Sequence, residues 1–156
     1  MTSHLKEGDK APEVFGNDQN GNAINWSDYK GKKVILYFYP KDDTPGCTLE
    51  ACNFRDNYSL LLERGISVIG VSADTEKKHQ KFIDKHKLPF PLIADTEKEL
   101  INAYGVWGLK KFMGREYDGI HRTTFVIDEQ GNIAKIIFKV KNKMASEQIL
   151  EALEMN

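Results

Sequence analysis

Three short runs of apolar residues constrain the fold of this chain more than any other feature. The runs are 33–39 (KVILYFY), 67–72 (SVIGVS) and 123–127 (TTFVI), and each is almost continuously apolar. Such runs are typical of central strands that are covered on both faces of a sheet. The run 133–140 (IAKIIFKV) alternates instead, which predicts a strand nearer an edge, and a further short run occupies 91–94.

Helical patterns fill the segments between these strands. They cover 45–63, 76–87, 97–104 and 146–153. A capping box of Thr96 and Glu99 is predicted to begin the third helix. The turn Gln130-Gly131-Asn132 is predicted to join the last two strands as a hairpin. Strands alternating with helices, then a hairpin and a closing helix, predict an α/β fold with a central mixed β-sheet flanked by helices.

Size and charge limit the classes of function. A chain of 156 residues fits one domain, so we expect a single domain spanning 1–156. With 22 basic and 23 acidic side chains the protein has no bulk field that attracts polyanions, and nucleic acid is not an expected partner. The start, MTSHLKEGDKAPEVF, lacks the apolar run of a signal peptide, and no later stretch approaches the roughly 20 apolar residues of a membrane span. We therefore expect a cytoplasmic protein that does not contact a membrane.

Both cysteines of the chain, Cys47 and Cys52, lie in one segment, YPKDDTPGCTLEACNFRD at 39–56. In a reducing compartment, two closely spaced cysteines indicate redox or metal chemistry more than a permanent bridge. Thr44 suits the N-cap of a helix and Pro45 its first position, which places Cys47 in the first turn. There the free N–H groups and the positive end of the helix dipole favour a thiolate, to which the Thr44 hydroxyl is also expected to donate.

The spacing of the two cysteines limits how they can pair. On an intact helix, a separation of five residues puts the Cα atoms roughly 8.6 Å apart, whereas a disulfide needs less than about 7 Å. Either the cysteines never pair, or they pair by unwinding part of the helix as a transient catalytic state. A structural thiol remains an alternative for Cys52, which lies between Ala51 and Phe54. The spacing C-x₄-C without a third cysteine does not predict a zinc or iron–sulfur site, and we expect no cofactor.

This segment of the sequence resembles the peroxiredoxins. Pro40, Thr44 and Cys47 reproduce the P-x-x-x-T-x-x-C signature of that family, and Cys52 has the spacing of its bacterioferritin comigratory protein, or PrxQ, subgroup. The resemblance extends to KEGDKAPEV near the start and to YGVWGLKKFMGREYDGIHRTTFVID at 104–128. It implies a thioredoxin-like fold and a thiol peroxidase that reduces hydrogen peroxide and organic hydroperoxides.

The resemblance also implies a role for each residue of the site. Cys47 corresponds to the peroxidatic cysteine, which becomes a sulfenic acid, and Cys52 to the resolving cysteine, which forms an intramolecular disulfide with it. Thioredoxin or a similar dithiol protein would reduce that disulfide. Arg122 corresponds to the arginine that holds the thiolate and the peroxide, while Thr44 orients them and Pro40 excludes water. Similar proteins are often monomers, which implies a monomer here.

Two other classes of function remain open on the residues alone. A general thiol–disulfide oxidoreductase on the same fold would have C-x-x-C at the helix start and a proline directly before the strand at 123–127, and this chain has neither. A binding or chaperone module built on a redox-inactive domain would be inert toward peroxide. Titration of the reduced protein with peroxide separates these classes.

The histidines of the chain have simpler interpretations than catalysis. His79 and His86 share one face of a predicted helix with apolar residues, so packing explains them better than metal binding. His121 borders the arginine and is a secondary candidate for tuning the site. The lysine pair 110–111 is predicted to be solvated in a loop, and Trp107 to lie either in the core or in a pocket wall, with the loop favouring the wall.

Overall fold

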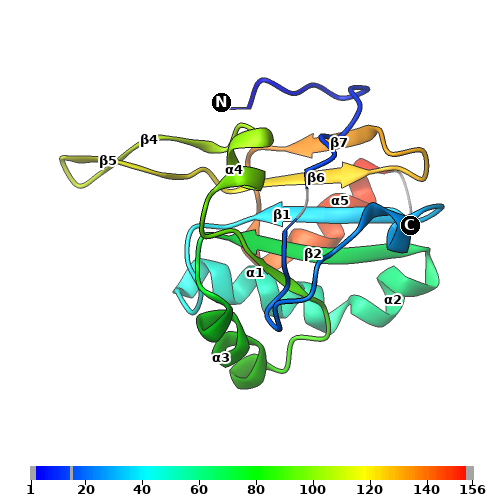
Figure 1. The fold of residues 1–156 in the computed structure, drawn as a ribbon, viewed down its shortest axis with the longest axis horizontal. Coiled ribbons are helices and arrows are strands. Elements are labelled where there is room, and N and C mark those ends of the chain that lie inside the picture. Colours follow the sequence, from blue (N-terminus) through cyan, green and yellow to red (C-terminus); the bar gives the residue numbers. More distant parts are fainter. Residues whose placement is uncertain (1–2, 15, 154–156) are drawn as a thin grey trace.

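The computed structural model describes residues 3–14 and 16–153. Its centre is a five-stranded sheet in the order β3-β2-β1-β6-β7 (Figure 1). The strands are β1 (Lys33–Phe38), β2 (Ile66–Ser72), β3 (Leu92–Ala94), β6 (Thr123–Ile127) and β7 (Ile133–Ile137). Strands β1, β2 and β3 are parallel, whereas β6 and β7 run antiparallel to their neighbours. The mixed sheet is confirmed, and the alternating run forms the edge strand β7 as predicted.

Strand β1 shows why the apolar runs form central strands. Val34, Leu36 and Phe38 pack into the core on one face of the sheet. Ile35 and Tyr37 pack into the core on the other face. All five are almost completely buried, and burial of a large apolar side chain contributes roughly 1.5–3 kcal/mol. A strand that supplies two cores has no polar face, which is the pattern seen in the sequence.

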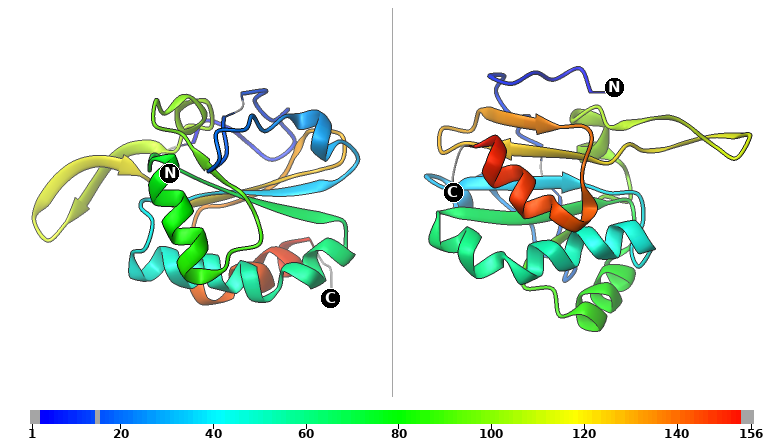
Figure 2. Two further views of the ribbon diagram at one scale, coloured as in Figure 1. Left: turned by 60° about the horizontal axis from the view of Figure 1, so that its bottom comes forward. Right: turned by 180° about the vertical axis from the view of Figure 1, so that it is seen from behind.

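Helices cover both faces of the sheet. They are α1 (Pro45–Asp56), α2 (Tyr58–Glu63), α3 (Glu76–His86), α4 (Glu99–Ala103) and α5 (Ala145–Ala152), with 3-10 turns η1 (Trp26–Tyr29) and η2 (Asn142–Met144). Helices α1, α2 and α5 lie on one face, and α4 and η1 lie on the other (Figure 2). This arrangement is the thioredoxin-like fold that the resemblance implies. Within the described ranges, every helix is too short or too polar to cross a membrane.

The helix predicted over 45–63 is divided at Asn57 into α1 and α2. The Asn57 side chain donates to the carbonyl of Asn53 at 2.8 Å. Asparagine competes in this way with the backbone hydrogen bonds of a helix, which explains the break. The break lies beyond both cysteines, so Cys47 and Cys52 share one uninterrupted helix.

The loop predicted for the lysine pair 110–111 is wrong, because these residues belong to a β-hairpin. Strands β4 (Trp107–Phe112) and β5 (Arg115–Ile120) form an arm that extends away from the body (Figure 1). Met113 and Gly114 form its two-residue turn with φ of 51° and 78°, the left-handed conformations that such hairpins use. Both faces of the arm are largely exposed, so its strands carry no alternation of apolar and polar residues.

The capping box predicted for α4 is also wrong. In the part of the chain that the structure describes, the helix begins at Glu99, and its N-cap residue is Lys98, which makes no side-chain cap. Instead, the buried carboxylate of Asp95 accepts hydrogen bonds from the backbone N–H groups of Leu100 and Ile101, at 3.2 and 2.8 Å. A carboxylate satisfies these free donors and also stabilises the positive end of the helix.

Candidate active site

The position of Cys47 in the first turn of α1 is confirmed. Thr44 is the N-cap residue, Pro45 occupies the first helical position, and the sulfur of Cys47 lies in a buried site. The predicted role of the Thr44 hydroxyl is wrong: it does not cap the helix, and it donates to the carbonyl of Lys41 at 2.8 Å rather than to the sulfur. The free N–H groups of the first turn therefore remain available to a negative charge at this end of the helix.

The structure brings Arg122 to Cys47. Arg122 Nη2 donates a hydrogen bond to Cys47 Sγ at 3.1 Å, although 75 positions separate the two residues. The sheet explains this contact, because Thr123 of β6 pairs with Phe38 at the end of β1 that leads toward α1. The residue before Thr123 must therefore lie beside the start of that helix. A charged donor at this distance stabilises a thiolate.

Glu50 is a member of the site that the sequence did not reveal. Its Oε1 accepts a hydrogen bond from Arg122 Nη1 at 2.6 Å, and its side chain is fully buried. Burial raises the pKa of Glu50 to about 7, against the lowering effect of Arg122. The sequence feature that could have indicated Glu50 is its position three residues after Cys47, because residues three apart lie on the same face of a helix.

The charges around Arg122 keep it cationic. Burial lowers the pKa of the guanidinium, but the negative charges and hydrogen bonds of Glu50 and Cys47 outweigh burial, and the net direction is upward. Among the described residues, Glu50 Oε2 has no hydrogen-bond partner. The site is thus a triad of a buried sulfur, a buried carboxyl group and a partly exposed guanidinium, in which the protonation of the carboxyl group sets how much of the arginine charge is neutralised.

Gly46 allows the side chains of Arg122 and Asn142 to lie close to the start of α1. A Cβ atom at this position would lie 2.9 Å from Asn142 Nδ2 and 3.4 Å from Arg122 Nη2. The first distance is shorter than real Cβ contacts, so a side chain here would displace one of its neighbours. Close packing around the start of α1 therefore explains why the residue before Cys47 is a glycine.

Cys52 lies further along α1 and is partly exposed. Both cysteines are free thiols on the unbroken helix, the geometry in which they are too far apart to pair. The sulfur of Cys52 lies 4.0 Å from His86 Nδ1 on α3. Contact with the imidazole of His86 argues against the alternative that Cys52 is a structural thiol packed only among apolar side chains.

Buried hydrogen bonds fix the loop between β1 and α1. Asp42 Oδ2 contacts His79 Nδ1 at 2.6 Å, and Asp42 Oδ1 accepts from the Tyr39 hydroxyl at 2.6 Å. The Asp42 N–H donates to Asp74 at 2.8 Å. His79 is fully buried as packing predicted, and its Nε2 donates to the carbonyl of Ile93 at 2.9 Å. This network holds the loop that begins at the half-buried Pro40.

Asp42, Asp74 and His79 also form a group of three possible metal ligands within 4.8 Å of one another among the described residues. Both ring nitrogens of His79 already have hydrogen-bond partners, so metal binding through the ring would break one of these bonds. The hydrogen bonds of the loop account for this cluster.

The base of the hairpin arm borders the site. Lys110 is not the solvated loop residue that was predicted, because its Nζ donates to the carbonyl of Ile120 at 3.0 Å. Burial, and then the positive charge of Arg122, lower its pKa. His121 Nε2 contacts the carbonyl of Leu109 at 3.0 Å, so this histidine faces the arm.

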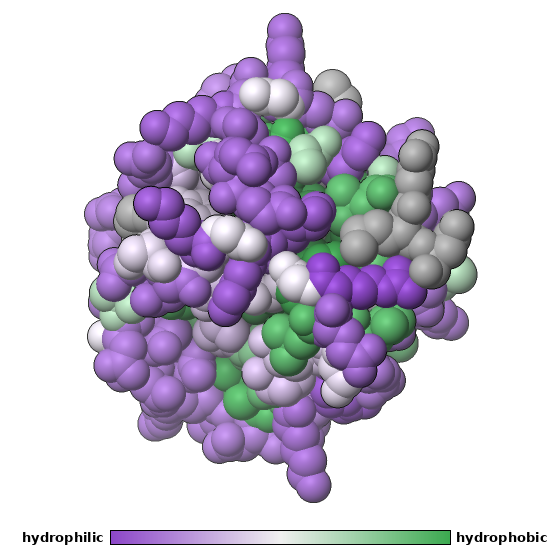
Figure 3. Space-filling model, turned by 90° about the vertical axis from the view of Figure 1, so that its right-hand side faces the viewer, coloured by the Kyte–Doolittle hydropathy of each residue, from purple (hydrophilic) through white to green (hydrophobic). Residues whose placement is uncertain are grey.

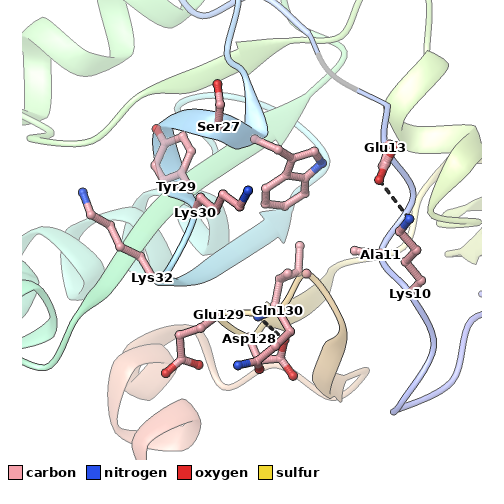
Figure 4. Close-up of a pocket in the computed structure, with 13 residues that line it drawn as sticks. Lys10, Ala11, Glu13, Ser27, Tyr29, Lys30, Lys32, Asp128, Glu129 and Gln130 are labelled. Carbon is pink, nitrogen blue, oxygen red and sulfur yellow. Dashed lines mark hydrogen bonds and ion pairs between the residues drawn. The ribbon is translucent and has the colours of Figure 1, made fainter.

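A cavity of about 680 Å³ lies at the opposite end of the sheet from Cys47. It opens between η1 and the turn after β6, on the face that Figure 3 shows. Tyr29 and Lys30 line one side and Gln130 the other, and Lys10 pairs with Glu13 at 3.0 Å (Figure 4). The chemistry of the cysteines does not extend to this cavity, because β1 spans the distance between them.

Fold and site together define a class of protein. A free cysteine bound by a guanidinium, in the first turn of a helix on a thioredoxin-like sheet, is the arrangement of a thiol-dependent peroxidase. Residues 7–136 match the model of the AhpC/TSA family, and the chain belongs to this family. Two relatives are Peroxiredoxin Bcp of Bacillus subtilis (strain 168), 50% identical over 96% of this chain and 94% of that protein, and Peroxiredoxin Bcp of Escherichia coli (strain K12), 45% identical over 88% and 90%.

Solved structures agree with this assignment. A PrxQ variant from Xylella fastidiosa superposes with a TM-score of 0.90 at 31% identity, covering 97% of each chain. The bacterioferritin comigratory protein of Xanthomonas campestris, studied for alkyl peroxide reduction, gives 0.85 at 30% identity and the same coverage. Of the three classes that the sequence left open, the chain is therefore the thiol-dependent peroxidase of the PrxQ type.

Proposed function

We propose that Cys47 is the peroxidatic cysteine and Cys52 the resolving cysteine of this enzyme. The observation that carries the proposal is the hydrogen bond of 3.1 Å from Arg122 to the Cys47 sulfur, in the first turn of a helix that also carries Cys52. The substrates are hydrogen peroxide and organic hydroperoxides, and the residues 1–156 act as one thioredoxin-like peroxiredoxin domain.

In the first step, the Cys47 thiolate attacks one oxygen of the peroxide. The S–O bond forms as the O–O bond breaks, the sulfur is oxidised to a sulfenic acid, and the second oxygen leaves as water or an alcohol after taking a proton. Charge moves from sulfur to oxygen in this step, and Arg122 lies where it can donate to both. Thr44 begins the helix that orients the thiolate, and Pro40 limits the access of water.

In the second step, the Cys52 sulfur attacks the sulfenic acid of Cys47. The S–S bond forms, the S–O bond breaks, and the hydroxyl group leaves as water. Part of α1 unwinds, because the two cysteines cannot meet on the intact helix. A bond that encloses so few residues gains little from chain entropy, which suits a disulfide that must be reduced in every cycle.

A thioredoxin-like dithiol protein is the proposed reductant, since exchange with a strained disulfide needs only an attacking thiolate. The proposed enzyme is a cytoplasmic monomer that uses no metal or other cofactor. Closely spaced cysteines with a catalytic disulfide are typical of a reducing compartment.

Replacement of Cys47 by serine tests the first assignment. The variant should lose peroxide reduction, because a serine hydroxyl stays protonated near neutrality and does not attack the O–O bond. Circular dichroism serves as the control for folding. Retained turnover in a folded Cys47→Ser variant would contradict the assignment.

Replacement of Cys52 by serine tests the second assignment. This variant should consume one equivalent of peroxide and then stop, with a sulfenic acid at Cys47 that dimedone traps as an adduct visible by mass spectrometry. If the variant forms no adduct and turns over with thioredoxin at the rate of the wild type, Cys52 is not the resolving residue.

A further inference from the structure

His86 links Cys52 to a carboxylate. Its Nδ1 lies 4.0 Å from Cys52 Sγ, and its Nε2 lies 3.1 Å from Asp43 Oδ1. Asp43 belongs to the loop before α1, whereas His86 is the last residue of α3 and its side chain is largely buried. Three separate segments thus bring a thiol and a carboxylate to opposite nitrogens of one imidazole ring.

The carboxylate determines which nitrogen of His86 carries hydrogen. Hydrogen bonds from Lys85 and then His86 lower the pKa of Asp43, so this group is an ionised acceptor at neutral pH. An ionised carboxylate accepts hydrogen bonds and cannot donate them. The Nε2 of His86 must therefore carry a hydrogen, so in the neutral form of the ring the lone pair lies on Nδ1, the nitrogen that is 4.0 Å from the Cys52 sulfur.

We propose that His86, oriented by Asp43, is the general base of the resolving step, so that Asp43, His86 and Cys52 form a second catalytic group beside the peroxidatic site. This inference rests on the proposed role of Cys52. The Cys52 S–H bond breaks as its proton moves to His86 Nδ1, and the resulting thiolate attacks the sulfur of the Cys47 sulfenic acid. The S–S bond forms, hydroxide leaves the Cys47 sulfur, and the proton held by His86 returns to it directly or through solvent to give water.

The geometry explains why a base is needed at this cysteine. Cys47 lies in the first turn beside Arg122, where dipole and guanidinium favour its thiolate. Cys52 lies in the middle of α1, away from the free N–H groups of the helix start. A thiol without such support is a poor nucleophile, and a neighbouring imidazole supplies what the helix does not.

The charges that face His86 come from each element packed around it. Besides Cys52 itself, they are Asp43 from the loop before α1, Lys85 from α3, and the Arg55–Asp56 pair of α1, whose guanidinium also donates to the His86 carbonyl at 2.8 Å. Lys85 is itself paired with Asp43 at 2.7 Å. The Asp43 carboxylate, 3.1 Å from His86 Nε2, also stabilises the imidazolium formed during proton transfer.

A His86→Gln variant tests this role. Glutamine retains a donor for Asp43 but has no basic nitrogen for Cys52. The reduced protein is mixed with one equivalent of hydrogen peroxide and quenched at intervals, and mass spectrometry counts the Cys47 sulfenic acid as its dimedone adduct and the disulfide. We expect formation of the sulfenic acid at the wild-type rate and a disulfide step slowed on the order of 100-fold, the usual scale of general base catalysis.

Two further measurements separate a base from a structural contact. A Lys85→Gln variant breaks the other bond between α3 and Asp43 and leaves the imidazole, so it should keep a fast disulfide step. A His86→Ala variant should recover part of the lost rate when free imidazole is added.

The outcomes distinguish this inference from the function on which it rests. If wild-type protein forms no disulfide between Cys47 and Cys52, the role of Cys52 is wrong and the inference fails with it. If the disulfide forms at one rate in the wild type and in His86→Gln, the resolving role stands and the inference is overturned. Equal slowing in Lys85→Gln and His86→Gln, without rescue by imidazole, would also overturn it, because His86 would then only anchor the loop.

Discussion

Arg122 Nη2 lies 3.1 Å from Cys47 Sγ, and the antiparallel pairing of β1 with β6 fixes this contact across 75 positions of sequence. The same guanidinium donates to Glu50 at 2.6 Å through its other nitrogen. One arginine therefore divides its charge between a thiol and a carboxyl group. On the proposal that Cys47 is the peroxidatic cysteine, we expect the reactivity of its sulfur to depend on that division.

Replacement of Arg122 by methionine should slow both alkylation of Cys47 at neutral pH and peroxide reduction. Loss of one charged donor to a transition state typically costs on the order of 100-fold or more in rate. Iodoacetamide trapping and stopped-flow peroxide consumption measure the two effects. Arg122→Lys is the matched control and should recover only part of the rate, because a lysine does not reach both partners as a fork does. Unchanged rates in Arg122→Met would place this residue outside the chemistry.

Replacement of Glu50 by glutamine should change how stability depends on pH. Burial raises the pKa of Glu50 from 4.5 to about 7, so the folded state favours the neutral carboxyl group. The stability that this preference contributes is present below about pH 4.5 and is lost as the pH rises through about 7. Glutamine is neutral throughout, so its stability relative to the wild type should increase between pH 5 and 8 by on the order of 3 kcal/mol.

Urea denaturation of both proteins at pH 5 and pH 8 measures this difference. Glu63→Gln is a matched control, because it removes the same charge from the end of α2, outside the site. A constant difference between Glu50→Gln and wild type across this range would mean that Glu50 titrates as an ordinary carboxyl group.

The sequence predicted the sheet and the place of Cys47 because both follow from local patterns. Apolar runs such as 33–39 define central strands, and the pair Thr44-Pro45 marks the start of the helix. Arg122 became a candidate only through the resemblance, since its contact with Cys47 depends on how β1 pairs with β6. No local pattern carries that information.

The other parts of the site were missed for related reasons. A glutamate within a helix normally faces water, and only burial beside Arg122 makes Glu50 part of the site. His86 was interpreted as packing because the pattern of α3 does not show that its end meets Cys52. The hairpin arm was missed because both of its faces are largely exposed, which leaves no periodicity to detect.

Replacement of Gly46 by alanine should slow peroxide reduction. The added Cβ would lie 2.9 Å from Asn142 Nδ2, so that side chain must move, and 3.4 Å from Arg122 Nη2, so the guanidinium is crowded from the side of the helix. A double variant that also carries Asn142→Ala opens the closer contact and should recover part of the rate. In a helix without this crowding, alanine would stabilise by roughly 1 kcal/mol. A Gly46→Ala protein that is more stable and fully active would show that the approach of Arg122 does not require glycine.

Replacement of His79 by leucine should destabilise the fold. The change leaves the buried Asp42 carboxyl group without the partner that now contacts it at 2.6 Å. Breaking a buried pair by removing one member typically costs about 3–5 kcal/mol. Denaturation in urea measures the loss, and the double variant with Asp42→Asn should recover part of it because no charge is then stranded. Equal stability of His79→Leu and the wild type would contradict the anchoring role of this pair.

Oxidation should loosen α1, on the proposal that Cys47 and Cys52 form the catalytic disulfide. Their Cα atoms lie roughly 8.6 Å apart on an intact helix, whereas a disulfide needs less than about 7 Å. At least one turn of Pro45–Asp56 must therefore open. Opening frees backbone N–H groups from their helical hydrogen bonds, so amide exchange across this helix should speed up in the oxidised protein.

Hydrogen exchange followed by mass spectrometry, on fully reduced protein and on protein with a confirmed intramolecular disulfide, measures this effect. Strand β1 is the internal control, because its pairing with β2 and β6 does not involve the cysteines and its protection should not change. The oxidised protein should also melt at a lower temperature, since the small loop that the bond closes does not offset the packing lost from Phe54 and Ala51. Equal exchange across α1 in the two redox states, with the disulfide confirmed, would show that the pair forms without unwinding the helix and that the geometric argument is wrong.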